Sequence, residues 1–203
     1  MAPMKQAQAV RERWSEILAT AGLFMACAAA FALLSWRVTA EVRQYSPEPQ
    51  YFEELTHVGV GAVIGWLAGG RRLAGLGILL SIGIDADHLG AVLGLPTLPR
   101  GSHSAIFIAL VCSLFWMLGT ARVLRVAPAL LLAVLVGAEC LNHIGVDALV
   151  GQGDFPIYAP ISWKFITFDR VQGAMLLTGA VGLALWGRLW SRREERATKG
   201  TSD

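Results

Sequence analysis

Long apolar runs separated by short polar stretches form the main pattern along the chain. The first run covers residues 17–36. At about 1.5 Å per residue, a helix of that length crosses a hydrocarbon core of roughly 30 Å. Further runs follow at residues 57–70, 73–84, 105–118, 128–150 and 171–190. This pattern predicts an all-α fold, a polytopic membrane helix bundle.

The runs at residues 57–70 and 73–84 are short and rich in glycine. As a helix, residues 57–70 would span only about 21 Å, which is less than the hydrocarbon core. Small residues let helices approach closely in lipid. We therefore expect a tight glycine-rich hairpin buried among longer helices. The bundle has about four to six transmembrane segments, depending on whether this hairpin crosses the membrane.

The same pattern gives a simple domain division. Residues 17–190 are expected to form one membrane-embedded domain, with a candidate site region at residues 56–165. Residues 1–16 form a cytoplasmic N-terminus, and the polar residues 191–203 are expected to form a disordered cytoplasmic tail. The first apolar run is longer than the roughly 7–15 residues of a signal-peptide core, so we expect an anchor that is retained.

Composition narrows the class of protein. Hydrophobic residues make up 55% of the chain and charged residues only 16%, which excludes an ordinary soluble domain. The three cysteines lie inside apolar runs without paired spacing, so structural disulfides are not expected. The net charge is +2 and no basic stripe carries interleaved aromatics, so nucleic acid is not an expected partner. Membrane lipids are the expected surroundings, and the sequence does not indicate an oligomeric state.

The basic residues predict an orientation. If both termini are cytoplasmic, only five of the 17 basic residues fall on the outer side: Arg37, Arg43, Arg100, Lys164 and Arg170. The positive-inside rule favours this arrangement, in a bacterial inner membrane. All four histidines then lie at the outer face: His57, His88, His103 and His143. Because Lys and Arg alone set the topology, this agreement is an independent indication of one site.

The run from Glu139 to Asp147 carries the first candidate chemistry. Glu139, His143 and Asp147 are spaced four apart, so on a helix they share one side. His143 and Asp147 could therefore grip one metal ion. The alternative is a buried histidine paired with an aspartate for helix packing. At the end of a membrane helix the functional reading is favoured, because ionisable residues there are costly.

Two further motifs supply ligands. In "DADH", Asp85 and Asp87 could both bind an ion, or one could bind while the other acts as a general base; the alternative is an acidic helix end in contact with water. In "RGSHS", His103 begins the next apolar run, a neighbouring serine can cap that helix, and Arg100 either holds a phosphate or anchors the chain at the interface.

The polar stretch after residue 150 contains Phe155, Tyr158 and Trp163. We expect an aromatic belt at the membrane interface rather than a roof over the site. The candidate metal ligands are therefore His57, Asp85, Asp87, His103, His143 and Asp147, with Asp85 and Asp87 also the candidate catalytic residues. His88 is the weakest of the histidines. The expected cofactor is a divalent metal, zinc, as one or two ions.

The order of these motifs resembles the YdjM-type family of inner-membrane, metal-dependent hydrolases. The matching positions span about residues 56–165: His57, Asp85-x-Asp87-His88, Gly101-x-His103-Ser104, His143-x-x-x-Asp147 and Pro160-x-Ser162-Trp163-Lys164. The chain departs from the family pattern at Ile84, where the family has proline. It also lacks the first histidine of the family's longer run before His103.

More distantly, the order of ligands is similar to zinc-dependent phospholipase C and related zinc nucleases. That resemblance implies a first zinc on His103, His143 and Asp147, and a second zinc on His57 and a shared Asp147. Asp85 or Asp87 would bridge the ions or act as the general base. The later HxxxE pair of those enzymes has no match here, so three ions are not expected.

These features predict a membrane-bound metal-dependent hydrolase, acting on a phospholipid or another phosphoester at the outer face. A metal-ion or proton transporter is the main alternative, because intramembrane carboxylates and histidines also mark ion pathways. A non-catalytic scaffold with a structural metal site also remains open. A haem-bearing bundle is disfavoured, because carboxylates stand beside three of the four histidines.

Overall fold

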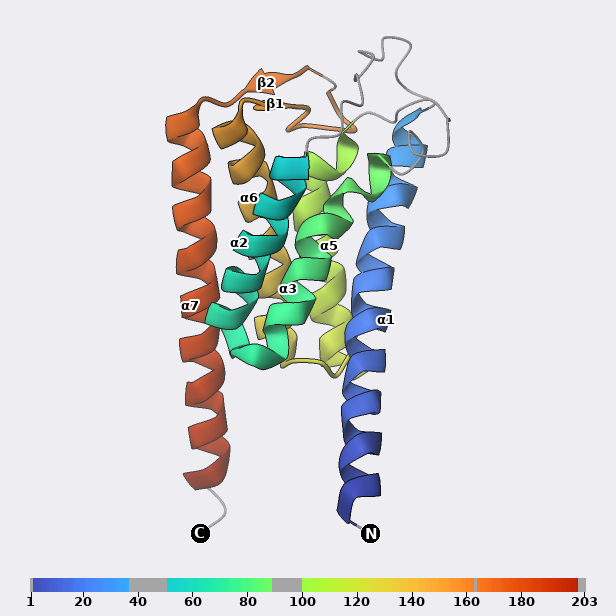
Figure 1. Cartoon of the computed structure of the whole chain (residues 1–203). Coiled ribbons are helices and arrows are strands. Elements are labelled where there is room, and N and C mark those ends of the chain that lie inside the picture. The colour runs from blue at the N-terminus through green and yellow to red at the C-terminus, as the bar shows by residue number, and fades with distance from the viewer. Residues whose placement is uncertain (1, 37–50, 89–99, 163, 201–203) are drawn as a thin grey trace.

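The computed structural model describes residues 2–36, 51–88, 100–162 and 164–200, and these are mostly helical (Figure 1). The α-helices are α1 (Ala2–Trp36), α2 (Tyr51–Gly69), α3 (Arg71–Gly83), α5 (Ala105–Thr120), α6 (Ala129–Val150) and α7 (Arg170–Gly200). Two short 3₁₀ helices, η1 (Ile84–His88) and η2 (Gly101–His103), and two short strands, β1 (Asp154–Phe155) and β2 (Ile166–Thr167), complete the fold. The prediction of a helical fold is confirmed.

Three of the described helices contain segments long and apolar enough to cross a membrane: Gln6–Phe31, Ala129–Val150 and Arg170–Glu194. Two shorter apolar helices, Leu55–Gly69 and Ala105–Thr120, accompany them. Within these segments 72% of the α6 span is buried inside the protein, against 28% for α1 and 22% for α7. α6 is therefore the most buried of the three, and α1 and α7 stand at opposite sides of the bundle (Figure 1). Several apolar side chains of α1 and α7 are exposed.

Aromatic side chains hold α1 against α5. The Phe24 ring lies edge-on to Phe107 at 6.0 Å and to Phe115 at 6.2 Å. All three rings are almost fully buried, and edge-to-face pairs of this kind add stability beyond the area that they bury. This contact keeps the start of α5, and with it η2, beside the upper part of α1.

Glycine brings α2 and α3 into backbone contact. The chain turns between them at Gly70, whose φ of 68° is the left-handed conformation that glycine adopts without steric cost. A Cβ added at Gly77 would lie 2.3 Å from the Gly61 carbonyl oxygen, and one at Gly65 would lie 2.3 Å from the Leu73 carbonyl oxygen. The two helices can approach this closely only because these positions lack side chains.

The C-terminal region differs from expectation. Residues 191–200 were expected to be disordered, but α7 continues through them to Gly200. Arginine, glutamate and alanine in this stretch favour helix, and Trp190 Nε1 donates to Glu194 Oε1 at 3.0 Å one turn later. Residues 201–203 lie outside the described residues. Both ends of the chain point to the same end of the bundle, opposite β1 and β2 (Figure 1).

Candidate metal centre

The buried face of α6 supplies two adjacent candidate ligands. His143 and Asp147 are one turn apart, and each is at most 1% exposed. His143 Nε2 lies 3.7 Å from Asp147 Oδ1. The i, i+4 spacing in the sequence therefore places both side chains together, as predicted, inside the bundle and near the end that carries β1 and β2 (Figure 1).

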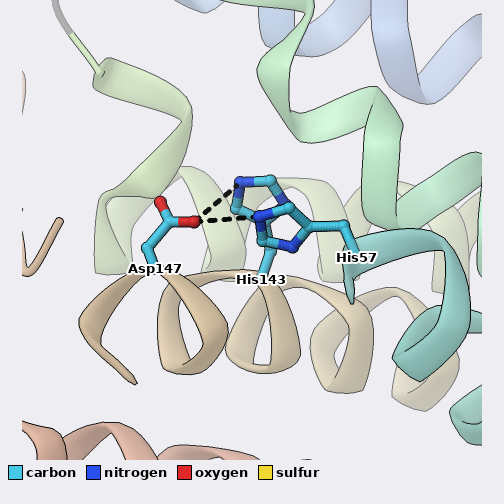
Figure 2. A group of neighbouring side chains, drawn as sticks. All are labelled: His57, His143 and Asp147. Atoms are coloured by element: carbon cyan, nitrogen blue, oxygen red, sulfur yellow. Dashed lines mark ion pairs between the residues drawn. The ribbon is translucent and has the colours of Figure 1, made fainter. Parts of the chain in front are cut away.

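α2 adds a third ligand from a distant part of the chain. The His57 ring stacks on the His143 ring, with centroids 3.9 Å apart and planes inclined by 10°. His57 Nε2 lies 3.0 Å from Asp147 Oδ1, so both imidazoles face the same carboxylate oxygen (Figure 2). His57, His143 and Asp147 form a buried group that could hold a metal ion.

The two 3₁₀ helices close the group from the other side. Asp85 Oδ1, on η1, lies 3.3 Å from His143 Nε2 and 3.6 Å from His103 Nε2. His103 Nε2, at the end of η2, lies 3.5 Å from the second oxygen of Asp147, Oδ2. Asp85, His103, His143 and Asp147 thus form a closed ring of contacts, to which His57 is joined through Asp147. Asp85 is the most exposed member, at 19%.

The spacing of these atoms suits a cation. Ligand atoms about 2.0–2.2 Å from a tetrahedral zinc lie roughly 3.4 Å apart, and the contacts around the ring run from 3.0 to 3.7 Å. Among the described residues, no hydrogen bond reaches His57 Nε2, His143 Nε2 or either oxygen of Asp147. Burying so many polar atoms without hydrogen bonds is unfavourable unless something else satisfies them.

The local charge also favours a bound cation. Among the described side chains, the group contains two carboxylates, Asp85 and Asp147, and one guanidinium, that of Arg100, whose Nη2 lies 3.4 Å from Asp147 Oδ2. With neutral imidazoles the group carries net negative charge in a buried position. A divalent cation would balance this charge and satisfy the lone pairs, so the residues fit such an ion.

A second layer of polar side chains fixes the orientation of His143. The carbonyl oxygen of Ser81 lies 2.7 Å from His143 Nδ1 and can only accept, so Nδ1 carries the proton and Nε2 presents its lone pair to the ligand ring. Asn142 Nδ2 donates to the Ser81 hydroxyl at 3.2 Å and to Glu139 Oε2 at 3.2 Å. Glu139 lies one helical turn before His143 on α6 and is the member of this layer farthest from it along that helix.

The connection between α6 and α7 covers the site. Phe155, on β1, is fully buried, and its ring lies parallel to that of His103, with centroids 5.8 Å apart. The Arg100 guanidinium lies 5.6 Å from the Phe155 ring centroid and donates to the side-chain and main-chain oxygens of Gln152 at 2.8 and 3.0 Å. The aromatic-belt expectation is therefore wrong for Phe155, because its ring packs on the ligand histidine.

We expect Phe155→Leu to lower the free energy of unfolding by on the order of 1 kcal/mol, because it removes ring contacts with His103 and Arg100 and leaves part of the volume empty. Thermal unfolding of the purified protein measures the change. Tyr158→Leu is the matched control on the same connection, because Tyr158 is 55% exposed. An equal effect of both substitutions would show that Phe155 does not support the site.

The structure brings together five of the six predicted ligands: His57, Asp85, His103, His143 and Asp147. The side chains of Asp87 and His88 lie outside the described residues, as does Trp163. Ser104 caps α5, since its side chain accepts from the Phe107 amide at 3.1 Å. Ser81, Asn142 and Phe155 were missed as supports of the site. Asn142 precedes His143 in the sequence, but nothing local marks the other two.

The chain matches no protein-family model, and neither a curated protein nor a solved structure is significantly similar to it. The resemblance to inner-membrane hydrolases thus stays a prediction from the motifs. The function has to be argued from the geometry of the site.

Proposed function

We propose that this chain is a membrane-embedded, metal-dependent hydrolase of phosphoesters, with phospholipids as the leading substrate class. The observation that carries the proposal is the closed ring of imidazole and carboxylate atoms around His143 and Asp147. Such a ring, buried at one end of an apolar bundle, is costly unless it has a function. The bacterial inner membrane, with both termini cytoplasmic and the site at the outer face, is the location that the charge pattern supports.

The geometry favours one ion rather than two. His143 Nε2 belongs to both ligand groups, the one with His57 and Asp147 and the one with Asp85 and His103. A single nitrogen lone pair binds a single ion. We therefore propose one zinc held by His57, His143 and Asp147. His103 then lies beside the other oxygen of Asp147, and Asp85 lies at the more exposed edge.

A zinc held here would lower the pKa of a water and polarise the bond to be cut. Asp85 would act as the proton acceptor, because it is the most exposed carboxylate of the ring. Arg100 is held by Gln152 with its guanidinium beside Asp147, where it can bind a phosphate oxygen of the substrate. Phe155 covers His103 and limits the access of bulk water.

The test combines metal analysis with turnover. The purified protein, in lipid nanodiscs, is loaded with zinc and assayed against phosphatidylglycerol, phosphatidylcholine and a soluble nitrophenyl phosphoester. We expect about one zinc per chain, and we expect Asp85→Asn to keep the zinc while turnover falls by about 10²-fold or more. Protein that holds no zinc, or zinc-loaded protein that cleaves none of these esters, contradicts the proposal.

One observation favours an ion transporter as the second candidate. Glu139, Asn142 and Ser81 form a buried polar layer beneath the histidines, and Glu139 Oε1 and Asn142 Oδ1 have no hydrogen bond among the described residues. Such a layer could pass a cation or a proton deeper into the bundle. Zinc or proton flux into proteoliposomes that depends on Glu139 would favour transport over hydrolysis.

A further inference from the structure

A second polar cavity lies at the opposite end of the bundle from the metal centre. It has a volume of about 210 Å³ and is bounded by the turn between α2 and α3, the loop before α6 and the last part of α7. The chain segments that form it lie at the lower end of the bundle in Figure 1. The cavity shares no residue with the metal centre, so it is a separate feature of the fold.

The lining of this cavity is strongly basic. Arg72, Arg188 and Arg192 line it, and no aspartate or glutamate does. Arg188 Nη1 donates to the Leu67 carbonyl at 3.4 Å, which keeps its guanidinium at the cavity. We call this cavity the arginine pocket. Arg188 is partly buried and Arg72 and Arg192 are exposed, so water screens their mutual repulsion. Three guanidinium groups around one small space still attract an anion.

Two helix N-termini add to the positive potential. α3 begins in the pocket after Gly70, and α6 begins there after Pro128, and neither cap residue makes a side-chain hydrogen bond to its helix. No side chain caps the first amides of either helix, and each helix dipole is positive at this end. Arg72 stands in the first turn of α3, where a cation is unfavourable without a counter-ion.

A buried hydroxyl completes the lining. Ser191 is only 8% exposed and lines the pocket, and its hydroxyl has no hydrogen bond among the described residues. Hydroxyl, amide and guanidinium donors with no carboxylate among the lining side chains are the set that recognises phosphate oxygens. Apolar side chains of α7 next to the pocket, Leu189 and Trp190, are 59% and 41% exposed, where acyl chains could lie.

We propose that the arginine pocket binds a phosphate group, supplied either by an anionic phospholipid headgroup or by free phosphate. The basic residues put this end of the bundle in the cytoplasm, where the leaflet carries anionic lipids. A phosphate seated here would join the α2–α3 turn to α6 and α7. The site would thus stabilise the bundle from the side opposite the metal centre, whether or not the metal centre is catalytic.

The test measures thermal stability and bound lipid in the full-length protein. Arg188→Gln with Arg192→Gln removes two pocket charges. Arg193→Gln with Arg196→Gln is the matched control, because it removes the same charge from the same helix outside the pocket lining. The first arm compares the protein in phosphatidylglycerol nanodiscs with the protein in phosphatidylcholine nanodiscs. The second arm compares phosphatidylcholine nanodiscs with and without added inorganic phosphate. Native mass spectrometry counts retained lipid.

We expect wild-type and control proteins to retain phosphatidylglycerol about tenfold better than the pocket variant, with a matching loss of thermal protection. Protection by inorganic phosphate alone, lost in the pocket variant, would identify free phosphate as the ligand. Equal losses in both double variants would mean general charge attraction and would overturn the proposal. So would a wild-type protein that neither anion protects. Circular dichroism serves as the check that each variant is folded.

Discussion

Asp147→Ala is expected to lower the affinity for zinc by at least about 100-fold, because Asp147 is the residue to which most of the site is joined. One of its oxygens faces His57 and His143, and the other faces His103 and Arg100. The substitution removes a ligand and also leaves the guanidinium of Arg100 without that carboxylate. Equilibrium competition with a chromophoric chelator, together with elemental analysis, measures the change.

Two further variants distinguish a loss of zinc binding from a loss of folding. Asp147→Asn keeps the shape of the side chain and removes its charge, so a folded protein with weakened zinc binding is expected. Glu12→Ala removes an exposed carboxylate from the first part of α1, far from the site, and zinc affinity should stay as in the wild type. Wild-type affinity in Asp147→Asn would mean that the buried ring is a packing arrangement and not a metal centre.

Gly77→Ala is expected to lower both the free energy of unfolding and the affinity for zinc. The added methyl group would lie 2.3 Å from the Gly61 carbonyl oxygen and 2.7 Å from Glu139 Oε1. Since one of these neighbours is backbone, α3 has to move away from α2, which carries His57. Overpacking of this kind costs about 1–3 kcal/mol. Displacement of His57 and Ser81 should also weaken zinc binding.

Gly59→Ala is the matched control, because it lies on α2 and an added Cβ there has no neighbour within 4 Å. Its unfolding temperature should equal or exceed that of the wild type, because alanine has a better helix propensity than glycine. Its zinc content should be that of the wild type. If Gly77→Ala were as stable as Gly59→Ala, the backbones of α2 and α3 could not be as close as the structure has them.

The sequence allowed the helices and the central pair of ligands to be predicted, since both follow from local periodicity. Apolar runs indicated the helices, and the spacing of His143 and Asp147 placed them on one face of α6. The charge bias also grouped His57 and His103 with them, although they lie on other segments. The structure brings these side chains together. A membrane topology would account for this, because it converts positions along the chain into positions in depth.

Other parts of the site depend on tertiary packing and leave no local pattern. Phe155 stands in a polar connection, and an aromatic residue there has the same sequence pattern whether it faces lipid or a histidine. The Ser81 carbonyl is a backbone group, so its contact with His143 is independent of side-chain identity. The charged, polar composition after residue 190 predicts disorder, but this part of α7 is helical because its residues are good helix formers.

The ligands of the site come from α2, η1, η2 and α6, which are separate in the sequence and meet only in the assembled bundle. A bound ion would therefore act as a cross-link between segments of the chain, and its binding free energy would add to that of folding. Helices in a bilayer keep their backbone hydrogen bonds even when they are apart. The ion would thus stabilise one packing of helices that are already formed. A protein with bound ion would be one in which the α2–α3 pair is packed on α6.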